Sequence, residues 1–529
     1  MKYNMMWRAP VSIGVLVFLV TCVGIWVPSA WSDEAATLTS TGRTWRELWA
    51  ELGTIDAVHG LYYAVVKLIT AVAGHSILTI RLVSAAAVAV TAALLVVLGR
   101  TLGGARLGFA SGLAFALVPR VVWAAGEGRM YGFVMLVAVG STLLLLTAAR
   151  RTGGPARRAW AVYGLVAALG VLLNLWLVLL VVAHGAALLL VARSSARGTT
   201  PGVVRVAPRA LVAWAVAAGA VGLATVPYAV VLMSQAQQVA WIESVSARTV
   251  RFFVVDGWFR SAIDFTPAGI VTLAVVPVAW TLIGIAVAAT IRHRIRIRSP
   301  RPAPARPDRT GAAPVEPVLL VLPLAFLPSL LLITATAAGI RTYAPQYASM
   351  SAPFVAVLLA AGVLALGRRW LRVLAGALLV ATAVPNLVAL RLPETKADGY
   401  WAPTAATVAE QRHPGDTEGV WFGSLDDAHW ANSHLVSIAY PRAFDGMRDL
   451  GTVTDAARDG HLWESNGAPA RLLPDRTADL DRVWFLGNER GDAEGRQVAA
   501  TLEDLGFERA DRTVVGAGVV DRWERITGQ

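Results

Sequence analysis

The sequence predicts a mainly α-helical protein that crosses a membrane many times and ends in a small α/β domain. Of the 529 residues, 56% are apolar and 16% are charged, whereas soluble domains average roughly 45–50% and about 25%. The mean hydropathy of +0.57 points the same way. Apolar runs of about 16 to 25 residues fill the chain up to residue 391, and helices of that length cross a bilayer. Residues 392–529 have a soluble composition and are long enough to bury a core.

The charge of the chain is divided between these two parts. The net charge of +12 and the pI of about 10.4 would suit a nucleic-acid-binding protein. However, residues 1–391 hold 33 basic and 11 acidic side chains, whereas residues 392–529 hold 14 and 24. The excess of positive charge therefore belongs to the membrane half, and we expect no nucleic-acid partner. The single cysteine, Cys22, excludes a disulfide framework and a cysteine-based metal site.

Eleven membrane spans account for the apolar runs. They are expected at residues 10–28, 82–99, 107–125, 130–148, 159–173, 175–192, 209–232, 267–291, 315–338, 351–367 and 371–390. Alternate connections carry 22 Lys and Arg residues, which mark the cytoplasmic side. The odd number of spans then places the N-terminus in the cytoplasm and the acidic domain outside. We expect a transmembrane domain over residues 1–391 and an extracytoplasmic domain over residues 392–529.

Two apolar segments allow a second interpretation. The segment at 59–74 is short for a span and contains Lys67. Counting it as a span would invert the predicted side of every later loop. We therefore expect a juxtamembrane helix here, within an outer loop at 29–81. Residues 1–30 resemble a signal peptide, but an uncleaved anchor is favoured. Arginine makes up 44 of the 47 basic residues, which is typical of a GC-rich bacterial genome. We therefore expect an actinobacterial plasma membrane.

Acidic residues of the membrane half gather on the predicted outer side. Asp33 and Glu34 follow the first span directly, and carboxylates at a membrane boundary are costly unless they are solvated, paired or used. In an alternative interpretation, Ser32 or Asp33 only caps a helix that starts near Glu34. Residues 45–52 form an amphipathic pattern with an indole-rich face, which suits a helix in the membrane interface. Glu47 and Glu51 fall on its other face, where we expect them to be solvated.

Three motifs resemble those of a known superfamily. They are the acidic pair after the first span, the stretch at 56–63 (Asp-Ala-Val-His-Gly-Leu-Tyr-Tyr), and residues 127–131 (Glu-Gly-Arg-Met-Tyr). Together with the outer juxtamembrane helices, these look like the polytopic GT-C glycosyltransferases, specifically the family 39 and protein O-mannosyltransferase-like group that includes the aminoarabinose transferases of lipid A. That group usually has a Pro-Pro pair before Leu-Tyr-Tyr. His59-Gly60 stands there in this chain, which leaves the role of His59 open.

The resemblance implies a reaction and a set of residues. Such enzymes move a sugar, here mannose or another hexose or pentose, from a polyprenyl-phosphate donor to a hydroxyl acceptor on the outer face, with inversion. The acceptor would be a glycan, a lipid or a protein of the cell envelope. The attacking hydroxyl must lose its proton, so a carboxylate is needed as general base. By match to the family motif, Asp33 takes that role, and Glu34 or Asp56 orients the acceptor or the neighbouring helices.

A fixed cation must stabilise the departing phosphate, and polar groups must hold the sugar. Arg129 and Arg341 are the first candidates for the cation, followed by Arg81, Arg120 and Arg260, although each could instead extend to lipid headgroups. The other expected substrate-binding residues are His59, Tyr62, Tyr131, Trp241, Glu243 and Tyr343. No EF-hand or zinc-type ligand spacing occurs, so we expect no metal and no other cofactor. Membrane lipids are expected partners.

The C-terminal domain reads as a three-layer α/β unit. Residues 419–423 and 482–486 are expected strands, 493–505 a helix, and 512–520 with 522–526 a closing hairpin. Its histidines, including His434, lack a ligand-like spacing, and we expect glycan binding or a lid rather than separate catalysis. Two other functions compete for the whole chain. A transporter or flippase of a lipid-linked sugar would need polar features at mid-span, and a non-enzymatic envelope-assembly protein would make the acidic pair dispensable.

Overall fold

A computed structural model of the chain describes residues 2–195, 208–259, 269–298, 315–396, 399–413, 415, 417–425, 432–491 and 493–526. The chain divides into two compact units. The first comprises Met1–Ile25, Val58–Tyr62 and Arg81–Leu390, and the second comprises Trp26–Ala57, Tyr63–Ile80 and Arg391–Gln529. The predicted outer loop is thus grouped largely with the C-terminal residues. Of the residues singled out above, Arg260 lies outside the described residues.

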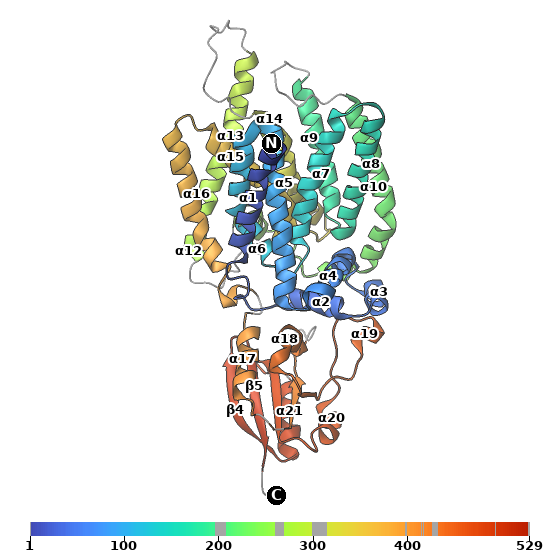
Figure 1. Ribbon diagram of the computed structural model, residues 1–529. Coiled ribbons are helices and arrows are strands. Elements are labelled where there is room, and N and C mark those ends of the chain that lie inside the picture. Colours follow the sequence, from blue (N-terminus) through green and yellow to red (C-terminus); the bar gives the residue numbers. More distant parts are fainter. Residues whose placement is uncertain are drawn as a thin grey trace. The chain divides into compact units, whose positions relative to one another are not determined.

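The first unit is a bundle of apolar helices (Figure 1). Its long helices are α1 (Lys2–Cys22), α5 (Ile77–Ala116), α7 (Tyr131–Arg150), α8 (Gly153–Leu173), α9 (Leu177–Ser195), α10 (Pro208–Ser234), α13 (Val275–Arg298), α14 (Val315–Ala337), α15 (Ala352–Ala365) and α16 (Arg369–Ala389). Shorter elements join them, namely α6 (Pro119–Ala125), η2 (Ala236–Val239), α11 (Ala247–Arg251), η3 (Phe252–Asp256), α12 (Gly269–Thr272) and η4 (Pro345–Ser351). Within the bundle, α7 packs on α8, α9 on α14, and α13 on α15.

Among the described residues, eight helices are long and apolar enough to cross a membrane, and three apolar helices are shorter. The longest of the eight, α5, contains two predicted spans, because Gly103 and Gly104 leave the helical conformation and Gly104 has φ +84°. A side-chain carbon at Gly99 would lie 2.7 Å from Gly108 Cα, so the two arms of α5 meet at glycines. The second arm ends at Ala116 rather than at 125, because Pro119 starts the separate helix α6. The count of eleven spans stays a prediction.

The second unit contains a five-stranded sheet in the order β2-β1-β3-β5-β4. Strands β1 (Glu418–Phe422), β2 (Arg448–Asp449) and β3 (Arg482–Asn488) are parallel, and β4 (Phe507–Val515) and β5 (Gly518–Arg525) form an antiparallel hairpin. The hairpin was predicted, but its position was wrong. The turn lies at 516–517, because Gly516 supplies the required positive φ of 60°.

Helices lie on both faces of this sheet (Figure 1). One apolar cluster joins α17 (Trp401–Gln411) and α18 (His434–Ala439) to one face, and another joins α20 (Pro469–Arg476) and α21 (Ala493–Asp504) to the opposite face. The predicted three layers are confirmed. The remaining elements of the unit are α2 (Ser32–Gly42), α3 (Trp45–Thr54), most of α4 (Gly60–Ala73), η5 (Pro393–Thr395), η6 (Pro441–Ala443) and α19 (Ala456–Asp459). Of η1 (Ala57–His59), only Ala57 belongs to it.

Burial lowers the pKa of His434 at the start of α18, while the nearby acids Asp449 and Glu464 oppose that shift. A lowered pKa means that the fold favours the neutral ring. The stability that this adds is present above the unfolded pKa of about 6.5 and is lost as the pH falls through the folded value. We therefore expect the unfolding temperature of the His434→Gln variant to fall less than that of the wild type between pH 7 and pH 4. Equal falls in thermal unfolding scans would contradict this.

Candidate active site

The acidic pair lies in the first turn of α2. The helix begins at Ser32 and Trp31 occupies the cap position, so the interpretation in which Ser32 or Asp33 caps the helix is wrong. The placement of both acids in the first turn was right, and it is favourable because the positive end of the helix dipole lies there. The two carboxylates have different surroundings. Glu34 is fully buried, whereas Asp33 keeps part of its surface accessible.

Glu34 forms an ion pair that was not predicted from the sequence. The Nζ of Lys396 lies 2.8 Å from Oε1 of Glu34, and both side chains are buried. Lys396 follows the last predicted span by only a few residues and is one of three lysines in the chain. The rarity of lysine among the basic residues was the sequence feature that could have drawn attention to Lys396. Because both partners are buried, this ion pair holds the Glu34 carboxylate in place.

Asp56 is buried and holds a rare backbone conformation for a residue with a side chain. Its φ is +58°, a left-handed value that Asp tolerates better than most residues. The hydroxyl of Tyr63 donates a hydrogen bond of 2.6 Å to the Asp56 carboxylate. Asp56 and Tyr63, the two ends of the motif at 56–63, both belong to the second unit. Tyr62, which belongs to the first unit, is fully buried and meets Phe133 edge-on at 5.9 Å, and His59 is half-buried.

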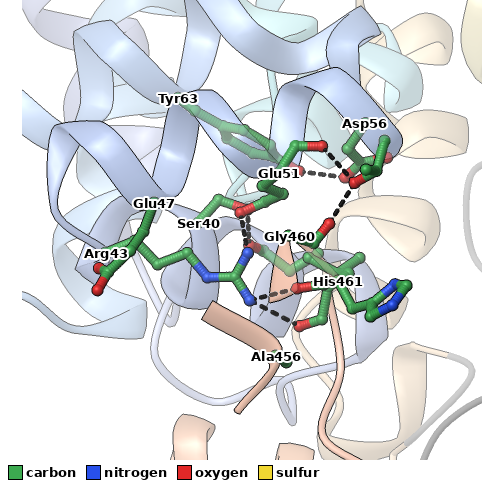
Figure 2. A network of polar contacts seen from close by, with 12 residues as sticks. Ser40, Arg43, Glu47, Glu51, Asp56, Tyr63, Ala456, Gly460 and His461 are labelled. Atoms are coloured by element: carbon green, nitrogen blue, oxygen red, sulfur yellow. Dashed lines mark hydrogen bonds and ion pairs between the residues drawn. The ribbon is translucent and has the colours of Figure 1, made fainter. Parts of the chain in front are cut away.

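The prediction that Glu51 is solvated was wrong. Its carboxylate is fully buried, 2.5 Å from Nη1 of Arg43, and it accepts a 2.6 Å hydrogen bond from Ser40 (Figure 2). Arg43 also donates to the carbonyl oxygen of His461 (Figure 2). Burial raises the pKa of Glu51, while Ser40 and Arg43 oppose that shift. The part of α3 around Glu51 therefore packs against protein instead of facing water.

The indole face of α3 is exposed instead. Trp45 and Trp49 keep 53% and 78% of their surface accessible, which agrees with a helix whose aromatic side is available to the membrane interface. Glu47, by contrast, behaves as expected of a surface residue. It closes a capping box with Thr44, and the hydrogen bonds of that box lower its pKa.

A second polar cluster lies in the first unit around Arg120 of α6. The Arg120 side chain is buried, its Nε donates a 3.1 Å hydrogen bond to the carbonyl oxygen of Gly257, and its guanidinium lies 4.5 Å from the ring centre of Trp123. Its electrostatic neighbours are Tyr131, Asp256, Tyr343 and Glu127. Tyr131 and Tyr343, both predicted to bind substrate, are thus neighbours of Arg120, which was a later candidate than Arg129 for the cation.

The Arg120 cluster consists of Arg120, Glu127, Tyr131, Asp256 and Tyr343, which come from separate parts of the chain. Arg129 is buried in the short link between α6 and α7, where its carbonyl oxygen accepts a hydrogen bond of 3.2 Å from Ser84 of α5. Tyr131 begins α7, and Tyr343 precedes η4, which packs against α6 and α7. Tyr343 is 4% exposed, and its hydroxyl has no hydrogen-bond partner among the described residues. Burial raises the pKa of Tyr343, so its hydroxyl stays protonated and can donate.

Three other predicted substrate contacts lie at the surface of the first unit. Trp241 is 60% exposed. Glu243 pairs with Arg248 at 2.8 Å, and both side chains are largely exposed. The exposed Arg341 donates a 2.8 Å hydrogen bond to the carbonyl oxygen of Ala240, so it holds this loop. Within the described part of the chain, no group of three or more His, Cys, Asp and Glu residues could hold a metal ion.

The bundle of apolar helices followed by an α/β domain defines a multi-pass membrane protein with a GT-C-like fold. A model of the dolichyl-phosphate-mannose-protein mannosyltransferase family matches residues 61–216. ArnT from Cupriavidus metallidurans bound to undecaprenyl phosphate superposes with a TM-score of 0.51 at 12% identity, over 98% of both chains. The predicted resemblance is therefore confirmed.

Two further solved structures are similar over most of the chain. The apo state of the same ArnT gives a TM-score of 0.49 at 12% identity, over 96% of this chain and 97% of that one. The oligosaccharyltransferase AglB from Archaeoglobus fulgidus, in complex with an inhibitory peptide and a dolichol-phosphate, gives 0.48 at 10% identity, over 91% of this chain and 69% of that one. No curated protein sequence matches the chain.

Proposed function

We propose that this protein is a membrane glycosyltransferase that transfers a sugar from a polyprenyl-phosphate donor to a hydroxyl acceptor of the cell envelope, on the outer face and with inversion. The observation that carries the proposal is the match of residues 61–216 to the dolichyl-phosphate-mannose-protein mannosyltransferase family. The fold shared with an ArnT that was solved with undecaprenyl phosphate supports the class of donor. Mannose is the first sugar to test.

Asp33 acts as the general base of this reaction. The acceptor oxygen forms a bond to the anomeric carbon while the bond from that carbon to the phosphate oxygen breaks, and the hydroxyl proton passes to the Asp33 carboxylate. Attack from the side opposite the phosphate inverts the anomeric centre. The partial exposure of Asp33 suits this role, because the base must reach a substrate, whereas Glu34 is held by Lys396.

The Arg120 cluster binds the phosphate of the donor. The departing phosphodiester gains charge as the sugar leaves, and fixed donors in a site shielded from water stabilise that charge better than water does. Arg120 supplies a buried guanidinium group, and the Tyr343 hydroxyl is a donor with no partner among the described residues. Arg129, which is buried in the link between α6 and α7, is a second candidate cation for the phosphate. Tyr131 and Glu127 line the same cluster. We assign Trp241, Glu243 and Arg341 no part in phosphate binding, because they lie on the surface.

The direct test incubates membranes that contain the wild-type protein with radiolabelled polyprenyl-phosphate mannose, and in parallel with the arabinose donor. We expect label to move from the lipid fraction into an envelope acceptor in proportion to the amount of protein. Membranes without the protein give the background. If the wild type consumes neither donor and also fails with a panel of other polyprenyl-phosphate sugars, the proposed function is wrong.

The orientation makes a separate prediction. Ser465 is exposed in the extracytoplasmic domain, and Arg151 is exposed between α7 and α8. In a Cys22→Ser background, we expect an impermeant thiol reagent to label Ser465→Cys in intact cells and to label Arg151→Cys only after lysis, because basic loops stay in the cytoplasm. The reverse pattern would invert the proposed topology.

A further inference from the structure

The residues just before α2 are hydrogen-bonded to the part of the chain that follows the last predicted span. The backbone N–H of Ser29 donates to the carbonyl oxygen of Pro393 at 2.9 Å, and the N–H of Ala402 donates to Ser29 Oγ at 3.1 Å. The N–H of Ala30 donates to the Tyr440 hydroxyl at 2.7 Å. Three hydrogen bonds thus connect two residues before α2 to three positions of the C-terminal part.

Apolar packing joins the same two segments. Ala30 and Ala35 are fully buried in the cluster that contains Trp401 and Trp484, which is the core on one face of the sheet. Helix α18 also packs on α2. The extracytoplasmic domain therefore uses α2 as part of its own core, and the position of α2 depends on that domain.

The ion pair between Lys396 and Glu34 fixes the rotation of α2 about its axis. A helix has 3.6 residues per turn, so neighbouring side chains point about 100° apart. If the Glu34 carboxylate is held in the interior by Lys396, Asp33 is directed to a different and more accessible side. Removing one partner of a buried ion pair is costly enough to rearrange the local structure.

We propose that Lys396 is a positioning residue for Asp33 and acts through Glu34. This inference rests on the proposed function, because it assigns the aim of the base to a lysine of the C-terminal part. It also gives that part a role distinct from glycan binding or a lid. In this role Lys396 touches neither donor nor acceptor. A direct contact between Lys396 and the donor phosphate is the alternative that the experiment must exclude.

The experiment compares Lys396→Met, Lys396→Arg, Glu34→Gln and the double variant Lys396→Met/Glu34→Gln in the full-length protein. Because misplacement of a reacting group by about 1 Å can cost up to about 100-fold, we expect Lys396→Met to lower kcat by about tenfold or more. The donor KM should stay within about twofold, since no binding contact is lost. Lys396→Arg should recover most of the activity. The double variant should be no worse than Lys396→Met, because residues that act through one contact are not additive.

Two results would overturn the proposal in favour of direct donor binding. In the first, Lys396→Met raises the donor KM whereas Glu34→Gln does not. In the second, the double variant loses as much activity as the two single losses combined. Amide hydrogen exchange over residues 33–40 provides a readout that needs no activity. We expect faster exchange there in Lys396→Met. The control is Arg482→Met, which breaks a buried ion pair of similar exposure, Arg482 to Glu418 at 3.0 Å, in the sheet.

Unchanged exchange over residues 33–40 in Lys396→Met would also overturn the proposal. The same holds for an equal increase in Arg482→Met, which would indicate a general loss of stability. If the wild type transfers no sugar, the proposed function fails on its own, while the exchange measurement still decides whether Lys396 holds α2 in place.

Discussion

Replacing Asp33 by Asn is expected to lower kcat for sugar transfer by about 10²- to 10⁴-fold, which is the usual contribution of a positioned general base. The amide has the shape of the carboxylate and can still accept a hydrogen bond, but it cannot take up the proton of the attacking hydroxyl. The donor KM should change little, because the base acts on the acceptor. Single-turnover assays with labelled donor and purified protein in detergent would separate kcat from binding.

The matched control for Asp33→Asn is Glu47→Gln. Glu47 is a carboxylate of the same predicted outer loop, but it serves the capping box of α3. A Gln side chain can close the same capping box, so this variant should leave the turnover per folded molecule near the wild-type value. If Asp33→Asn kept the wild-type turnover, Asp33 would not be the general base. Equal losses in both variants would point to disruption of the loop rather than to proton transfer.

Local pattern was sufficient to predict where the helices and the acidic pair lie. The first turn of α2, the amphipathic helix α3 and the strands β1 and β3 follow from residue spacing, because side-chain periodicity is a property of the segment itself. The eleven apolar runs were visible for the same reason. The motif at 56–63 was also visible in the sequence, and its first and last residues, Asp56 and Tyr63, form a hydrogen bond.

Contacts between distant segments could not be predicted. Glu51 was expected to face water because its neighbours three and four positions away set only the relative faces of α3. Which face is covered depends on Arg43 and on the carbonyl oxygen of His461, more than 400 residues later in the chain. The ion pair between Lys396 and Glu34 is a similar case, because the sequence around Glu34 does not indicate that Lys396 is its partner. Arg120 was ranked too low because its neighbours come from three separate segments, at 127–131, 256 and 343.

Replacing Arg120 by Gln is expected to lower kcat by about 10²- to 10³-fold, the range seen when one donor to a developing negative charge is removed. The guanidinium is buried and close to Tyr343 and Asp256, so its charge acts where water screens it little. Binding of the free polyprenyl phosphate should weaken as well, because the phosphate carries its largest charge after the sugar has left. Both effects would be measured on the purified protein, with Arg248→Gln, an exposed arginine paired with Glu243, as the control.

Arg120 also donates to the carbonyl oxygen of Gly257, so its loss could act through folding alone. Tyr343→Phe separates the two effects. The Tyr343 hydroxyl has no partner among the described residues, so removing it breaks none of the described hydrogen bonds and should leave the unfolding temperature unchanged or slightly raised. If this hydroxyl donates to the departing phosphate, kcat should nevertheless fall by about tenfold, corresponding to the loss of one hydrogen bond to a charged group. Two results together would show that the cluster is structural and that the phosphate binds elsewhere. Tyr343→Phe would keep full activity, and Arg120→Gln would lose activity only in proportion to its loss of folded protein.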